Sequence, residues 1–77
     1  MNIYKLTQTV NTDYDTFDAA IVAAENAECA QQMHPGGGLV VERGTEEWAD
    51  PKDVTVELIG TSTDEKQQVL LASFNAG

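Results

Sequence analysis

The stretch NIYKLTQTVNTDYDTFDAAIVAA, residues 2–24, decides the fold because it predicts a β-hairpin. Residues 2–10 alternate between apolar and polar side chains, which is the pattern of a half-buried strand. The face predicted to be buried carries Tyr4, Leu6, Gln8 and Val10. Residues 11–15 are turn formers that compete for backbone hydrogen bonds. The alanines of residues 16–24 would allow a helix, but large apolar side chains directly after a turn favour a returning strand.

A short helix is predicted after the hairpin. Asn26 suits its N-cap, and the helix then runs to about Met33. The sequence HPGGG, residues 34–38, ends it, because proline disfavours helix at the preceding residue and glycines loosen the backbone. His34 is predicted to cap the helix C-terminus with a partial positive charge. Two turns of helix are not stable alone, so this helix is expected to pack on the sheet.

The remaining segments predict the rest of the sheet. They are a short edge strand at residues 39–42, a helical turn at 45–50 stopped by Pro51, a strand at 54–59, a polar connection at 61–68 and a strand at 69–74. The last strand is apolar on both faces, which predicts a central position. The order is β-β-α-(β)-β-β. We therefore expect one α+β domain over residues 1–77, an antiparallel sheet of about four strands with the helix on one face.

The charge balance narrows the classes of partner. The 77 residues carry 13 acidic against 4 basic side chains, a net charge of -9. This charge disfavours direct binding to nucleic acid and to anionic membranes. It favours basic partners, although solubility alone is an alternative explanation. The sequence has neither a signal-peptide pattern nor an apolar run of about 20 residues, and one cysteine allows no intrachain disulfide, so a reducing cytoplasm is expected.

No catalytic, metal-binding or cofactor-binding constellation is predicted, and we expect the chain not to be an enzyme. Cys29 follows an acidic residue and is predicted to be a small buried hydrophobe. His34 is the only histidine, which excludes multi-histidine zinc sites and histidine relays. The turn at residues 13–18 lacks the glycine and glutamate of a calcium loop, and the triple glycine lacks a phosphate-loop pattern and predicts a flexible connector.

An acidic segment is the candidate partner-binding surface. It consists of Glu42, Glu46, Glu47, Trp48, Asp50, Asp53 and Glu57. Carboxylates two apart on a strand, or three and four apart on a helix, share one face and can imitate a row of phosphates. An exposed Trp48 would supply an apolar anchor. In the alternative, Trp48 is the main core aromatic and the acids are its solvated rim.

Several separated motifs together resemble a family of small uncharacterised proteins encoded by tailed phages and prophages. The matching motifs are YDTFDAAIVAAEN (14–26), His34-Pro35, Trp48, Ile59-Gly60 and LASFNAG (71–77). The resemblance covers most of the chain and is weakest from Gly36 to Glu47. It implies a bacterial host cytoplasm and a virus-encoded accessory role, and it transfers no site residue.

Three hypotheses follow for the function. The first is a phage-type accessory protein that binds a basic host protein, such as an acidic inhibitor of a nucleic-acid-binding defence protein. The second is an assembly module that forms a homodimer through an exposed edge strand at Leu39 to Glu42. The third, ranked last, is an enzyme that uses only the acids Asp13, Asp15 and Asp18.

Overall fold

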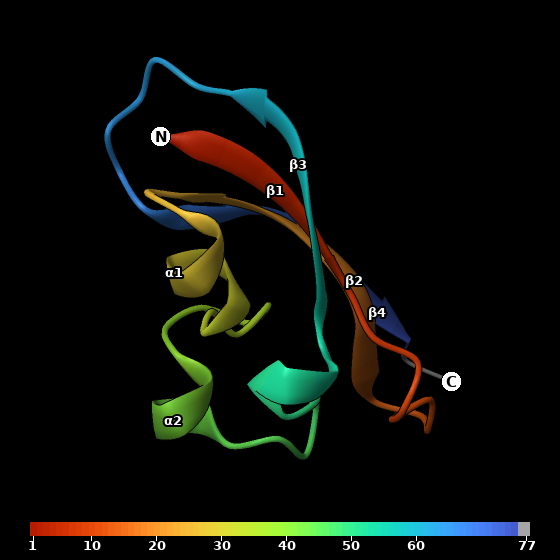
Figure 1. Cartoon of the computed structure of the whole chain (residues 1–77). Helices are drawn as coiled ribbons and strands as arrows, with labels where there is room; N and C mark the ends of the chain where they lie inside the picture. Colours follow the sequence, from red (N-terminus) through yellow and green to blue (C-terminus); the bar gives the residue numbers. More distant parts are fainter. Residues whose placement is uncertain (76–77) are drawn as a thin grey trace.

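Four antiparallel strands form a single sheet that carries the helices on one face (Figure 1). The computed structural model describes residues 1–75. The elements are β1 (Asn2–Thr7), β2 (Thr16–Ala24), α1 (Ala27–Gln31), α2 (Val40–Arg43), the 3₁₀ helix η1 (Pro51–Asp53), β3 (Thr55–Thr61) and β4 (Gln68–Asn75). The strand order is β3-β1-β2-β4. The predicted α+β fold and its four-stranded antiparallel sheet are thus confirmed.

The hairpin of β1 and β2 forms the centre of the sheet. Tyr4 lies opposite Val22, and Leu6 lies opposite Ala20. All four side chains are buried, so one face of the hairpin points into the core. The predicted strand 2–10 is too long, because β1 ends at Thr7 and the chain then turns.

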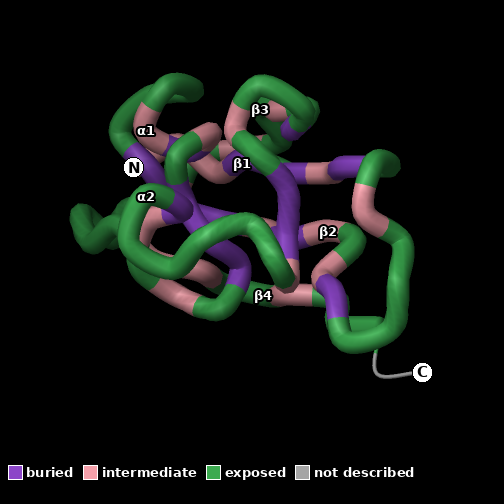
Figure 2. Tube along the Cα trace, turned by 90° about the horizontal axis from the view of Figure 1, so that it is seen from below, coloured by how far each residue is buried: buried purple, intermediate pink, exposed green. Residues whose placement is uncertain are grey.

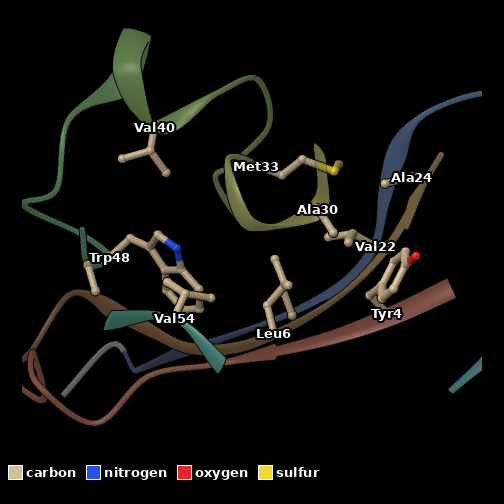
Figure 3. Close-up of a cluster of buried hydrophobic side chains, with 11 residues drawn as sticks. Tyr4, Leu6, Val22, Ala24, Ala30, Met33, Val40, Trp48 and Val54 are labelled. Atoms are coloured by element: carbon tan, nitrogen blue, oxygen red, sulfur yellow. The ribbon is translucent and has the colours of Figure 1, made fainter. Parts of the chain in front are cut away.

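The core lies between this face of the sheet and the segment from α1 to η1. Trp48, Val40, Met33 and Ala30 point from that segment toward Leu6, Val22 and Tyr4 on the strands (Figure 3). Figure 2 shows the buried stretches running along the central strands. Each large side chain buried here contributes about 1.5–3 kcal/mol of transfer free energy, so the covering segment depends on these contacts and not on its very short helices.

Helix α1 begins as predicted. The Asn26 side chain accepts a hydrogen bond from the Cys29 backbone N–H at 2.8 Å, which is an N-cap. Cys29 is only half-buried and packs against the edge of the core. None of the helices in residues 1–75 has the length and apolar character that crossing a membrane requires.

Two segments between α1 and β3 differ from their predicted secondary structure. Residues 40–42 of the predicted edge strand belong to helix α2, held by the Arg43 N–H to Leu39 C=O bond at 3.0 Å, and Leu39 itself forms only an isolated β-bridge with Met33. Residues 45–50 form a turn without helix, and Pro51 starts η1 instead of stopping a helix, because proline has a suitable φ for a first helical position.

Strand β4 was predicted to be central but is an edge strand. It pairs only with β2, and Leu70, Leu71 and Phe74 on it remain 47%, 67% and 42% exposed. Burial at the centre of the sheet therefore does not explain why β4 carries apolar side chains on both faces.

Candidate functional site

The loop between β1 and β2 lies beside the loop that follows α2. The Asn11 side-chain amide donates to the backbone carbonyls of Glu46 at 3.0 Å and Trp48 at 2.9 Å. The Phe17 N–H donates to the Glu47 carbonyl at 2.7 Å. Both loops lie at the lower end of the molecule in Figure 1. These bonds join two acidic segments that are far apart in the sequence.

A buried glutamine holds the first of these loops in shape. Gln8 is 5% exposed, and its Nε2 donates to the carbonyls of Asn11 at 2.7 Å and Phe17 at 2.9 Å. Its Oε1 accepts from the backbone N–H groups of Val10 at 3.0 Å and Asn11 at 2.8 Å. The side chain thus uses its whole hydrogen-bonding capacity on the loop.

The hairpin loop and the first residues of β2 together place three aspartates in solvent. Asp15 has a φ of 63°, a left-handed conformation that aspartate tolerates better than most residues, and its N–H donates to the Asn75 carbonyl at 2.6 Å. The Thr16 hydroxyl donates to the Asp13 carbonyl at 2.6 Å. Asp13, Asp15 and Asp18 are all exposed. The turn interpretation is therefore confirmed for residues 13–15, whereas residues 16–18 already belong to β2.

The second segment holds its acids in different ways. The Asp50 carboxylate accepts from the Lys52 N–H at 3.1 Å and caps η1. Glu47 lies 3.8 Å from Arg43 in a half-exposed ion pair, which is worth little to stability. Glu42 and Glu46 are exposed.

We define the acidic end as the set of acids on these two joined segments: Asp13, Asp15, Asp18, Glu42, Glu46, Glu47, Asp50 and Asp53, eight of the chain's 13 acidic residues. Only Arg43 and Lys52 interrupt it on those segments. Within residues 1–75, no group of three or more histidine, cysteine or acidic side chains has a metal-holding arrangement.

Two predicted members of the binding segment lie elsewhere. Trp48 is 0% exposed and sits in the core, so its role as an exposed anchor is wrong and the core alternative is confirmed. Glu57 lies on β3 opposite Lys5, on the sheet face that points away from the core. In their place the structure adds Asp13 and Asp15 of the hairpin loop and Asp18 near the start of β2. The only local signal for this juxtaposition was Asn11, a turn residue whose distant partners the sequence does not reveal.

His34 is buried instead of capping α1 with a charge. It is 1% exposed, its Nδ1 accepts from the Gly36 N–H at 2.9 Å, and its ring meets Phe17 edge-on at 5.8 Å. The C-cap of α1 is Gln32. Burial lowers the pKa of His34 below 6.5, the Arg43 guanidinium lowers the pKa further, and the Glu47 carboxylate raises it. The folded state therefore favours the neutral form of the His34 imidazole over the protonated form.

The triple glycine forms a closed turn around His34. The His34 N–H donates to the Gly38 carbonyl at 3.0 Å, and the Gly37 N–H donates to the His34 carbonyl at 2.9 Å. Gly37 has a φ of 106°, which favours glycine. A Cβ on Gly36 would lie 2.9 Å from Arg43 Nη2. These contacts replace the predicted flexible connector with a defined turn, beside a hollow of about 460 Å³ that this turn and the start of β4 line.

The stability of the protein should depend on pH through His34. In the unfolded chain the imidazole takes up a proton as the pH falls through about 6.5, whereas the folded chain resists protonation until a lower pH. The free energy of unfolding is therefore expected to fall as the pH drops below 6.5 and to be insensitive to His34 above it. Urea unfolding of the wild type and of His34→Asn between pH 7.5 and 5.0 measures this slope.

The wild type and His34→Asn share all carboxylates. The difference between their slopes of unfolding free energy against pH therefore gives the contribution of His34 alone. The imidazole is also the only histidine NMR signal of the chain, so its pKa can be titrated directly. A measured pKa at or above 6.5 would contradict the prediction.

Comparison with known proteins returned no relative. No family model matches the chain, and neither a curated protein nor a solved structure matches it.

Proposed function

We propose that the chain is a non-enzymatic, phage-type accessory protein that binds a basic surface of a host protein in the host cytoplasm through its acidic end. The observation that carries this proposal is the hydrogen-bonded junction between the two loops, in which Asn11 and Phe17 hold separate acidic segments side by side. A preorganised array loses little conformational freedom on binding. Its negative field also accelerates the capture of a basic partner.

The chemistry of such a partner follows from that of the array. A protein that binds nucleic acid carries lysine and arginine where phosphates would lie. An array of carboxylates on one end of a small domain can occupy such a surface and exclude the nucleic acid. We therefore propose the basic, nucleic-acid-binding face of a host defence protein as the target. Inhibition by occlusion requires no catalytic group.

Two triple variants test the location of binding. The acidic-end variant carries Glu42→Gln, Glu46→Gln and Asp53→Asn, and the control carries Glu25→Gln, Glu28→Gln and Glu65→Gln. All six side chains are exposed, and each triple removes three charges from the net charge of -9. Asp50 and Glu47 are left intact because one caps η1 and the other pairs with Arg43.

The acidic-end variant is expected to bind the partner at least about tenfold more weakly, mainly through slower association, and with a flatter dependence on salt. The control should bind as the wild type does. The partner is first captured from bacterial lysate at low salt, then purified and measured by surface plasmon resonance, with a DNA competitor in a second series. An equal loss of affinity in both triple variants would show that binding depends on the net charge of the protein and not on the acidic end. Unchanged affinity in both would refute electrostatic binding.

A further inference from the structure

The exposed side of β4 lacks two of the features that normally protect a sheet edge, charged side chains and prolines. Natural edge strands are blunted by charged side chains, prolines, bulges or short length. β4 is eight residues long and contains neither a charged residue nor a proline, although 22% of the chain is charged. Figure 2 shows β4 at the surface, and its residues are intermediate or exposed throughout. An uncharged edge in a strongly acidic chain is therefore open to pairing with another strand.

The other edge of the sheet is protected. β3 carries the exposed charge of Glu57 near its middle. It also has a register irregularity opposite Ile3 and Tyr4. β4 also has an irregularity, the extra residue Leu70 opposite Ile21 and Val22, but it pairs one-to-one with β2 from Leu71 to Ser73. The second irregularity is an extra residue in β2, Asp18, and not in β4. The regular part of β4 is therefore the stretch from Leu71 to Ser73, centred on Ala72, and this stretch can act as a template for another strand.

The sheet face away from α1 and α2, which we name the outer face, has a hollow beside this edge. The hollow measures about 160 Å³ and is lined by residues of β2 and β4 that include Ala19, Ile21, Leu71 and Ser73. Ala19 and Ser73 lie opposite each other and have small side chains, whereas Ile21 lies opposite Leu71. Leu71 is 67% exposed. The outer face thus presents an apolar knob directly next to an apolar hollow.

We infer that β4 pairs antiparallel with β4 of a second copy of this chain, about a two-fold axis at Ala72. Side chains that face each other across an antiparallel pair lie on the same face of the sheet. An axis at Ala72 places Leu71 of one copy opposite Ser73 of the other, where its side chain reaches the hollow over Ala19. The same contact occurs twice because a two-fold interface is self-complementary. The second copy is the occupant because it supplies both an uncharged strand and the leucine that fits the hollow.

The dimer and the acidic end respond to salt with opposite signs. Two chains of net charge -9 repel each other, so added salt should strengthen β4 pairing by screening that repulsion. Binding of a basic partner at the acidic end should weaken in the same salt. Salt dependence therefore distinguishes β4 pairing from partner binding at the acidic end, and either can be absent without the other.

Sedimentation equilibrium of the full chain tests the inference, with Leu71→Lys, Leu71→Ala and Leu58→Lys as variants. Leu58 is a matched control, since it is 60% exposed on the protected edge strand β3. The wild type and Leu58→Lys are expected to reach twice the monomer mass of 8.3 kDa, more readily at high salt. Leu71→Lys should remain monomeric, and Leu71→Ala should raise the dissociation constant at least about tenfold, because the hollow loses its knob.

Circular dichroism checks that each variant is folded. We expect folding to be retained because both leucines are exposed. A wild type that stays monomeric at NMR concentrations and high salt would overturn the inference. So would a dimer that Leu58→Lys disrupts and Leu71→Lys leaves intact.

Discussion

Replacing Trp48 with alanine is expected to lower the free energy of unfolding by about 3–5 kcal/mol, the cost of truncating a large buried aromatic. Trp48 is 0% exposed and is the largest of the fully buried side chains. A domain of this size has a total stability of only about 4–12 kcal/mol. The alanine variant should therefore be partly unfolded at 37 °C. Urea unfolding followed by far-UV circular dichroism measures the loss.

Trp48→Phe separates the two contributions of the indole. The phenylalanine ring keeps much of the buried area. The substitution also removes the indole Nε1–H, which has no hydrogen-bond acceptor within residues 1–75. A buried donor without a partner costs about 1–3 kcal/mol, so relief of this cost should offset part of the lost packing. Trp48→Phe is expected to cost less than half as much as Trp48→Ala.

Tyr14→Ala is the exposed aromatic control. Tyr14 is 75% exposed, and its replacement should change stability by less than about 0.5 kcal/mol. If Trp48→Ala cost no more than Tyr14→Ala, Trp48 would not be the centre of the core.

Local signals in the sequence were sufficient for the hairpin and for α1. Alternation up to Thr7, a cluster of turn formers and Asn26 as N-cap each depend on residues within a few positions of one another. The predicted edge strand at Leu39 to Glu42 was wrong because four apolar and charged residues fit either a strand or a helical turn. Contacts of the buried Val40 with the core decide between the two.

The position of β4 in the sheet could not be predicted from its own residues. Apolar side chains on both faces are typical of a central strand, and an uncharged strand that meets a second chain has the same composition. Whether a strand is central or at an edge depends on which strands pair with it. β2 pairs with β1, which directly precedes it in the chain, and with β4, which is far from it in the sequence.

Only one of the two acidic segments was singled out from the sequence as a partner-binding surface. The acids from Glu42 to Asp53 lie at the surface, and the segment with Asp13, Asp15 and Asp18 is held beside them only through Asn11 and Phe17. These bonds end on backbone carbonyls, which carry no sequence signal. The sequence left open whether Trp48 is an exposed anchor or a core residue, because its acidic neighbours are compatible with both, and the structure places it in the core.

Replacing Gln8 with leucine is expected to cost about 2–4 kcal/mol, because the backbone groups that its buried amide satisfies would lose their partners. Its Oε1 and Nε2 together make four hydrogen bonds within the loop, two of them to Asn11. A leucine fills a similar volume, so the loss measures the hydrogen bonds and not a cavity. Urea unfolding followed by Trp48 fluorescence measures it, with the exposed Gln67→Leu as a control expected to change stability by less than about 0.5 kcal/mol.

The Gln8→Leu variant also tests whether the acidic end binds as a preorganised array. Gln8 carries no charge, so the net charge of -9 and every carboxylate remain. Loosening the loop should release Asn11 from the Glu46 and Trp48 carbonyls and separate the two acidic segments. At a temperature where the variant is still folded, we expect weaker partner binding with an unchanged sign of salt dependence, because the array must then be ordered on binding. Wild-type affinity in a folded Gln8→Leu protein would mean that either segment binds alone and that the junction serves stability only.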